Sequence, residues 1–132
     1  MTAYRTRDGA KTAILTIGAP SYIGAQASDA LATRGVPVDV HVVNGFPIED
    51  ATIETFGSRY TRILTIEDGL IGTVDAGLRG FAAYAAGKFA GRGIRVEHCG
   101  IVDPRIAPSE TFQEVWAHFG MTAEALTERL AK

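Results

Sequence analysis

Residues 11–43, KTAILTIGAPSYIGAQASDALATRGVPVDVHVV, decide the fold class, because they hold a strand, a helix and a second strand in succession. Residues 11–17 and 37–43 are runs rich in β-branched side chains, which is typical of strands. Between them, apolar side chains recur at helical spacing over residues 23–34, and Gly35 follows as a C-terminal cap. This order predicts two parallel strands joined by a helix.

The same order repeats along the rest of the chain. We expect a helix over residues 51–59, a strand over 62–66, a long helix of small residues over 73–90 and a strand over 93–99. Residues 3–7 alternate before the Asp8-Gly9 turn, so the first strand should run opposite to the second. The pattern predicts one domain, residues 1–132, of the three-layer α/β/α class. Its five-stranded sheet would be mostly parallel, with one antiparallel strand.

Two further helices are expected near the end of the chain. Phe112, Trp116 and Phe119 form an apolar stripe that predicts a helix docked on the sheet. Thr122 can cap a last short helix, whose inner face carries Leu126.

Composition narrows the classes of protein. Thirteen basic and fifteen acidic side chains give a net charge of -2, so charge does not predict a nucleic-acid partner or an anionic membrane surface. The most apolar stretch, residues 81–91, is interrupted by Lys88 and is shorter than the roughly 20 residues that a membrane helix needs. Cys99 is the only cysteine, which excludes an internal disulfide. We therefore expect a soluble protein in the cytoplasm.

The common catalytic and binding motifs do not occur. Residues 18–24, GAPSYIG, lack the lysine and the glycine spacing of a phosphate-binding loop. His41, His98 and His118 are far apart and none belongs to an H-E-x-x-H sequence, so no metal site is expected. Ser21 lacks the G-x-S-x-G surroundings of a hydrolase nucleophile. We expect no catalytic, metal-binding or cofactor-binding residue in this chain.

Polar residues gather where the strands end, which is where open α/β sheets bind ligands. This set comprises Ser21, Tyr22, Asn44, Glu67, Asp68, His98 and Asp103. Ser21 and Tyr22 are interpreted first as a helix-entry turn, and His98 with Cys99 as a packed strand end. Glu67 and Asp68 either begin a solvated loop that runs to Gly72 or line a partner or substrate rim. The candidate rim residues are Glu67, Asp68, Gly69 and Gly72, and Ser21 and Tyr22 would lie next to them if the strand order reverses between the two loops.

Four segments carry a resemblance to a known family. They are TAILTIG at 12–18, VDVHVVN at 38–44 leading to FPIED at 46–50, RILTIED at 62–68 with its glycine loop, and GMTAEAL at 120–126. In order and spacing they resemble the C-terminal domain of transketolases. The same domain ends the β subunits of 2-oxoacid dehydrogenase E1 components and 1-deoxyxylulose-5-phosphate synthase. Asp68, where a second Glu is common, and residues 81–91 depart from the pattern and leave the substrate open.

The resemblance implies a role within a larger enzyme. In this family, thiamine diphosphate and Mg²⁺ are held between a pyrophosphate-binding domain, with its Gly-Asp-Gly motif, and a pyrimidine-binding domain. No Gly-Asp-Gly occurs in this chain. The resemblance therefore implies a C-terminal domain or small subunit that is not catalytic alone. It would pack beside those two domains or subunits, extend a dimer interface and present its strand-end loops toward a substrate channel.

A second class of function stays open. The chain could be a free-standing α/β module that binds a partner or a small anion. The two are distinguished by whether the parent chain or a neighbouring gene supplies the missing cofactor domains, and a homodimer is an option for either.

Overall fold

The computed structural model describes residues 1–103 and 111–132. In that part of the chain the strands are β1 (Thr2–Arg5), β2 (Thr12–Ile17), β3 (Val38–Val42), β4 (Arg62–Leu70), β5 (Gly72–Thr73), β6 (Gly77–Leu78) and β7 (Arg95–Ile101). The helices are α1 (Ser21–Thr33), α2 (Asp50–Arg59), α3 (Gly80–Phe89), α4 (Phe112–His118) and α5 (Ala123–Leu130).

The main sheet has five strands in the order β1-β3-β2-β4-β7. β1 runs antiparallel to β3, whereas β3, β2, β4 and β7 are parallel to one another. This arrangement confirms the predicted α/β class with one antiparallel strand.

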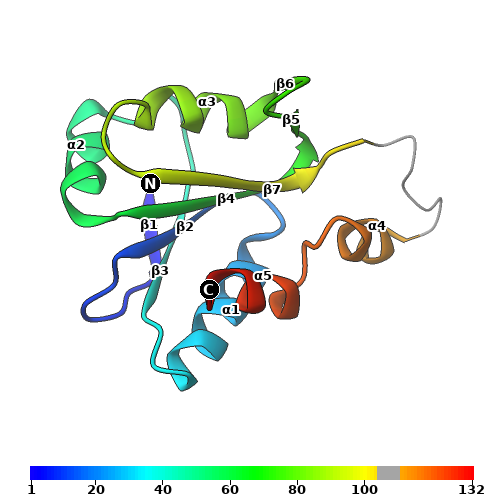
Figure 1. The fold of residues 1–132 in the computed structure, drawn as a ribbon, viewed down its shortest axis with the longest axis horizontal. Helices are drawn as coiled ribbons and strands as arrows, with labels where there is room; N and C mark the ends of the chain where they lie inside the picture. The colour runs from blue at the N-terminus through cyan, green and yellow to red at the C-terminus, as the bar shows by residue number, and fades with distance from the viewer. Residues whose placement is uncertain (104–110) are drawn as a thin grey trace.

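Helices cover both faces of the sheet (Figure 1). On one face, α1 and α5 contribute Leu31 and Leu126 to a core that includes Leu64 of β4. On the other face, α2 and α3 contribute Phe56 and Phe89 to a core with Leu15 of β2. The alternation of side chains along each buried strand supplies both layers, because successive residues point to opposite faces.

The prediction of a helix over residues 73–90 is wrong about where the helix begins. Residues 72–78 form the small β5-β6 hairpin, in which Gly72 pairs with Leu78, and α3 begins only at Gly80. Gly77 and Gly80 have φ of 110° and 60°, which the interior of a right-handed helix does not accommodate, so no helix can run through them from residue 73. The small residues that resembled a helix therefore include a turn. β4 is also longer than expected, so Glu67 and Asp68 lie near its carboxyl end rather than in a loop.

The order of the strands reverses between β2 and β4. From β2 the chain crosses through α1 to β3 on one side, and from β4 it crosses through α3 to β7 on the other side. The carboxyl ends of β2 and β4 lie next to each other, since Ile17 pairs with Glu67. This is the kind of reversal at which open α/β sheets form ligand crevices.

Candidate functional site

The predicted rim residues converge on this reversal but divide between the two faces of the sheet. Glu67 and Asp68 are consecutive in β4, so their side chains point in opposite directions. Glu67 meets α3, and Asp68 meets α4. Ser21 and Tyr22 begin α1 on the same face as Asp68.

The Ser21 hydroxyl forms hydrogen bonds within the segment that joins β2 to α1. It donates to the carbonyl oxygen of Gly18 at 2.8 Å and accepts a hydrogen bond from the Thr16 hydroxyl at 2.9 Å. These bonds fix the path from β2 into α1. A substrate or partner contact of Ser21 stays a prediction.

Tyr22, Trp116 and Asp68 form a chain of contacts between α1, α4 and β4. The Trp116 indole N–H donates to Oδ1 of Asp68 at 2.8 Å, and the rings of Trp116 and Tyr22 have centroids 6.3 Å apart. Trp116 is buried, whereas Tyr22 is 46% exposed. Phe112 was expected in the apolar stripe that packs on the sheet. It is instead exposed, and its ring packs edge to face against Trp116. Among these residues, only Trp116 belongs to the core.

Glu67 is a buried carboxylate that caps a helix. It is 8% exposed, and its two oxygens accept hydrogen bonds from the backbone N–H groups of Phe81 at 3.0 Å and Ala82 at 2.8 Å. These N–H groups lie in the first turn of α3, where a helix has no partners of its own for them. The interpretation of Glu67 as part of a solvated loop is therefore wrong.

Two glycines make room for this carboxylate. A Cβ atom on Gly80 would lie 2.6 Å from Oε2 of Glu67, and one on Gly69 would lie 3.3 Å from the same oxygen. Gly69 thus serves the packing of Glu67. The cap could not be found from sequence, because its donors follow the carboxylate by fourteen and fifteen residues.

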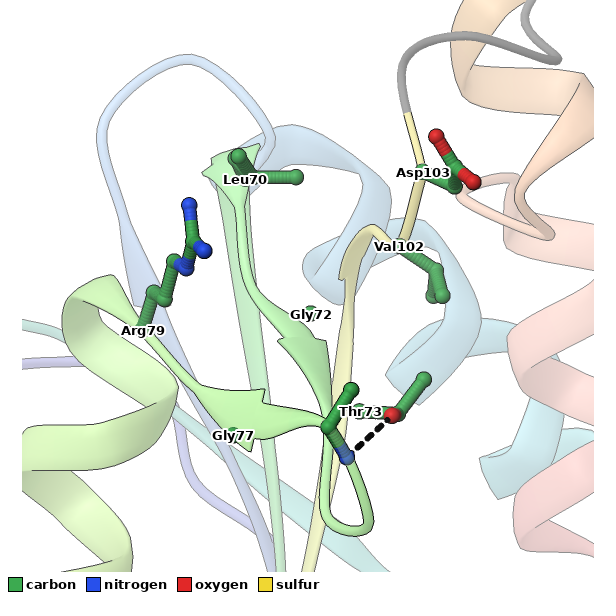
Figure 2. Close-up of a pocket in the computed structure, with 8 residues that line it drawn as sticks. Leu70, Gly72, Thr73, Gly77, Arg79, Val102 and Asp103 are labelled. Atoms are coloured by element: carbon green, nitrogen blue, oxygen red, sulfur yellow. Dashed lines mark hydrogen bonds between the residues drawn. The ribbon is translucent and has the colours of Figure 1, made fainter.

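A pocket of about 380 Å³ lies beyond the carboxyl end of β4 (Figure 2). It is lined by Leu70, Gly72, Thr73, Ala76, Gly77, Arg79, Val102 and Asp103. Gly72, which was predicted on the rim, and Asp103, which was predicted among the polar strand-end residues, therefore both line this pocket. Arg79 carried no signal in the sequence, because the segment around it resembled a helix interior.

The other strand-end residues lie apart from the reversal. The Asn44 side-chain amide donates to the Thr2 hydroxyl at 2.7 Å, and His98 Nδ1 lies 2.8 Å from the Thr65 hydroxyl. Burial, followed by the nearby Arg129 charge, lowers the pKa of His98. Burial raises the pKa of Cys99 to about 11, which disfavours the reactive thiolate.

A buried polar network was not predicted. Asp39 is fully buried and accepts hydrogen bonds from the Arg59 guanidinium at 2.7 Å, the Tyr60 hydroxyl at 2.5 Å and the Arg7 backbone N–H at 2.7 Å. Because the Tyr60 hydroxyl donates to Asp39, it accepts from Nε2 of His41, 2.9 Å away. Burial raises the pKa of Tyr60 and lowers that of His41. The network ties β3 to the end of α2.

Within the described residues, no three His, Cys, Asp or Glu side chains are placed to share a metal ion. No helix in that part of the chain is long and apolar enough to span a membrane.

The strand order, the covered faces and the reversal define an open, doubly wound α/β domain. No protein-family model matches the sequence, and no curated protein matches it. Solved structures do match. A split-gene transketolase described as an inactive beta4 tetramer superimposes with a TM-score of 0.78 at 17% identity, over 95% of this chain and 39% of that one.

Two further transketolase structures give the same result. The enzyme from Campylobacter jejuni matches with a TM-score of 0.67 at 16% identity, over 98% of this chain and 18% of that one. A variant of the enzyme from Pichia stipitis matches with a TM-score of 0.63 at 19% identity, over 98% of this chain and 17% of that one. The chain therefore has a fold like that of the transketolase C-terminal domain, as the sequence predicted. It spans less than half the length of each of these proteins.

Proposed function

We propose that this chain is the C-terminal domain, or a small subunit, of a thiamine diphosphate-dependent enzyme of the transketolase type. The observation that carries the proposal is the likeness to the split-gene transketolase over 95% of this chain. Since the chain covers 39% of that protein, the cofactor-binding domains would lie elsewhere in the parent chain or in another subunit. The parent enzyme would transfer ketol groups or decarboxylate 2-oxoacids in the cytoplasm.

The acidic residues at the reversal do not fit a magnesium diphosphate site. Both oxygens of Glu67 accept N–H groups of α3, and Oδ1 of Asp68 accepts the indole N–H of Trp116. A magnesium site needs oxygen ligands that are free to turn toward the ion. We therefore assign thiamine diphosphate and Mg²⁺ to the pyrophosphate- and pyrimidine-binding domains of the parent enzyme, and no catalysis to this chain alone.

Exposed apolar side chains support a packing role for the carboxyl edge of the sheet. Eight large hydrophobic side chains are exposed among the described residues, and six of them lie at or just after the carboxyl end of a strand or begin α4. These six are Tyr22, Phe46, Leu70, Val74, Val102 and Phe112. Apolar surface gathered at one edge is typical of an interface. We propose that this edge packs against the pyrimidine-binding domain, extends the dimer interface and forms the rim of the substrate channel.

The test is isothermal titration calorimetry with thiamine diphosphate and Mg²⁺. The purified chain is titrated alone and then mixed with a candidate cofactor-domain subunit encoded beside it. We expect heat of binding only in the mixture, together with ketol-transfer or decarboxylase activity. Tight binding by the chain alone would overturn the proposal, and a lack of association with any such subunit would favour a free-standing module.

A matched pair of variants tests the packing edge. Phe112 and Tyr4 are exposed to similar extents, 55% and 45%, but Tyr4 lies on the edge strand β1. Phe112→Ser should weaken assembly with the cofactor subunit in sedimentation velocity, whereas Tyr4→Ser should not. The reverse result would place the interface on the β1 side.

A further inference from the structure

Charged side chains are distributed unevenly between the two ends of the sheet. The carboxyl edge is the set of residues that end or follow the parallel strands, together with the start of α4. It comprises residues 18–22, 43–50, 67–80, 102–103 and 111–114. Of the side chains that the structure describes, this edge holds seven of the fourteen acids but only one of the twelve bases, Arg79. The seven acids are Glu49, Asp50, Glu67, Asp68, Asp75, Asp103 and Glu114.

The two ends therefore carry opposite charge. The edge has a formal side-chain charge of -6, whereas the other described residues, with seven acids and eleven bases, have a charge of +4. Ion pairs between described residues use only acids that lie away from the edge, and Glu97 alone is shared by three arginines. A single exposed carboxylate is an ordinary solvated group. The distinguishing feature is the gathering of like charges at one end of the domain.

The helices explain part of this segregation but not its size. Asp50 and Glu114 lie in the first turns of α2 and α4, where a negative charge stabilises a helix N-terminus. Each helix N-terminus carries about +0.5 of charge, so the four that lie at this edge offset only about two negative charges. The edge therefore keeps a negative potential.

The same edge carries the exposed apolar side chains on which the packing proposal depends. Asp75 directly follows Val74, which is 79% exposed, and Asp103 directly follows Val102. Protein interfaces have an apolar centre and a polar rim. Carboxylates on such a rim favour a partner surface with positive side chains, because like charges facing each other across an interface repel. Two copies of this edge would repel each other for the same reason.

We propose that the surface covering the carboxyl edge is a basic face of the cofactor-binding part of the parent enzyme. The inference rests on the proposed function for the identity of the partner, but the charge comes from this chain alone. A basic partner face attracts the acidic edge and repels the basic end, so the field turns the edge toward the partner during approach. Such steering raises association rates by about 10–10³-fold at low ionic strength.

The first test measures the potential of the chain without a partner. Relaxation of amide protons in ¹⁵N-resolved NMR spectra is recorded at low salt with two nitroxides, the cation aminomethyl-PROXYL and the anion carboxy-PROXYL. We expect the cation to relax the Asp75 amide about fivefold more strongly than the anion, since a potential near one kT is sufficient. The order should reverse at Gly93, which lies between Arg92 and Arg95. Equal effects of the two probes at Asp75 would overturn the proposal and leave the proposed function intact.

The second test measures assembly with the candidate cofactor-domain subunit encoded beside the chain. In stopped-flow mixing, the association rate should fall about tenfold or more between roughly 0.05 and 0.5 M NaCl. Asp75→Lys should slow association about threefold or more at low salt. Asp8→Lys is the matched control, because Asp8 is also an exposed acid in a tight turn but lies between β1 and β2, at the other end of the sheet. It should not slow association.

The outcomes separate the two proposals. If the subunit associates at the same rate at both salt concentrations, or if both variants slow association equally, the partner face is not basic and only the proposed function stands. If the subunit does not associate, both proposals are wrong. The salt comparison uses the unmodified chain, so it decides the question even if Asp75→Lys folds poorly.

Discussion

Replacing Glu67 by Gln should destabilise the domain, because the carboxylate holds the first turn of α3. Its two oxygens accept the N–H groups of Phe81 and Ala82 while the side chain is 8% exposed. Gln offers one carbonyl oxygen, and its amide group would face the second N–H as another donor. A hydrogen bond to a charged group contributes about 1.5–3 kcal/mol. The lost negative charge at a helix N-terminus adds about 0.3–1 kcal/mol.

We therefore expect Glu67→Gln to lower the free energy of unfolding by about 3 kcal/mol. In urea, where slopes are about 1–3 kcal/mol per molar, the midpoint should fall by roughly 1–3 M. Hydrogen exchange should accelerate most at the Phe81 and Ala82 amides. Glu128→Gln is the control, because Glu128 forms an exposed pair with Arg34, and such pairs add little stability.

The capping role would be refuted if both variants unfolded at the same urea concentration as the unmodified chain. If Glu67→Gln kept its stability but abolished the activity of an assembled enzyme, Glu67 would instead be a residue of the substrate rim.

Two more predictions concern the buried network at β3. Asp39→Asn should lower the free energy of unfolding by about 3 kcal/mol, measured in urea, because the Arg59 guanidinium and two further donors share that carboxylate; an unchanged midpoint would contradict it. Because burial lowers the pKa of His41 below its ordinary 6.5, the folded state resists protonation, so stability should be full above pH 6.5 and fall as the pH drops toward the folded pKa. His41→Gln should flatten this dependence in urea titrations at several pH values, whereas replacement of the exposed His118 should not, and equal slopes would refute it.

The order of the elements could be predicted because it follows from local patterns. The β-branched runs at residues 12–17 and 38–42 and the helical spacing between them are properties of short segments. The antiparallel first strand followed from the Asp8-Gly9 turn, although β1 pairs with β3 rather than with its sequence neighbour. The single-domain boundary over residues 1–132 stays a prediction.

The candidate site could be predicted only in part, because its contacts join distant segments. Trp116 and Asp68 are 48 residues apart, and nothing in either neighbourhood indicates their hydrogen bond. The hairpin before α3 was missed because small residues fit both a helix and a tight turn, and only the positive φ of Gly77 and Gly80 separates the two. Arg79 was missed with it. Proximity at the sheet edge was predictable, whereas the partner of each side chain was not.

The packing of α5 on α1 affects when the domain can fold during synthesis. Leu126 and Leu130 of α5 complete the same core as Leu31 of α1, about a hundred residues earlier in the chain. Until α5 has left the ribosome, that face of the sheet has no cover and its apolar side chains meet water. The domain should therefore reach its native state only after its last helix has been made, and a chaperone would have its best opportunity to bind during that interval.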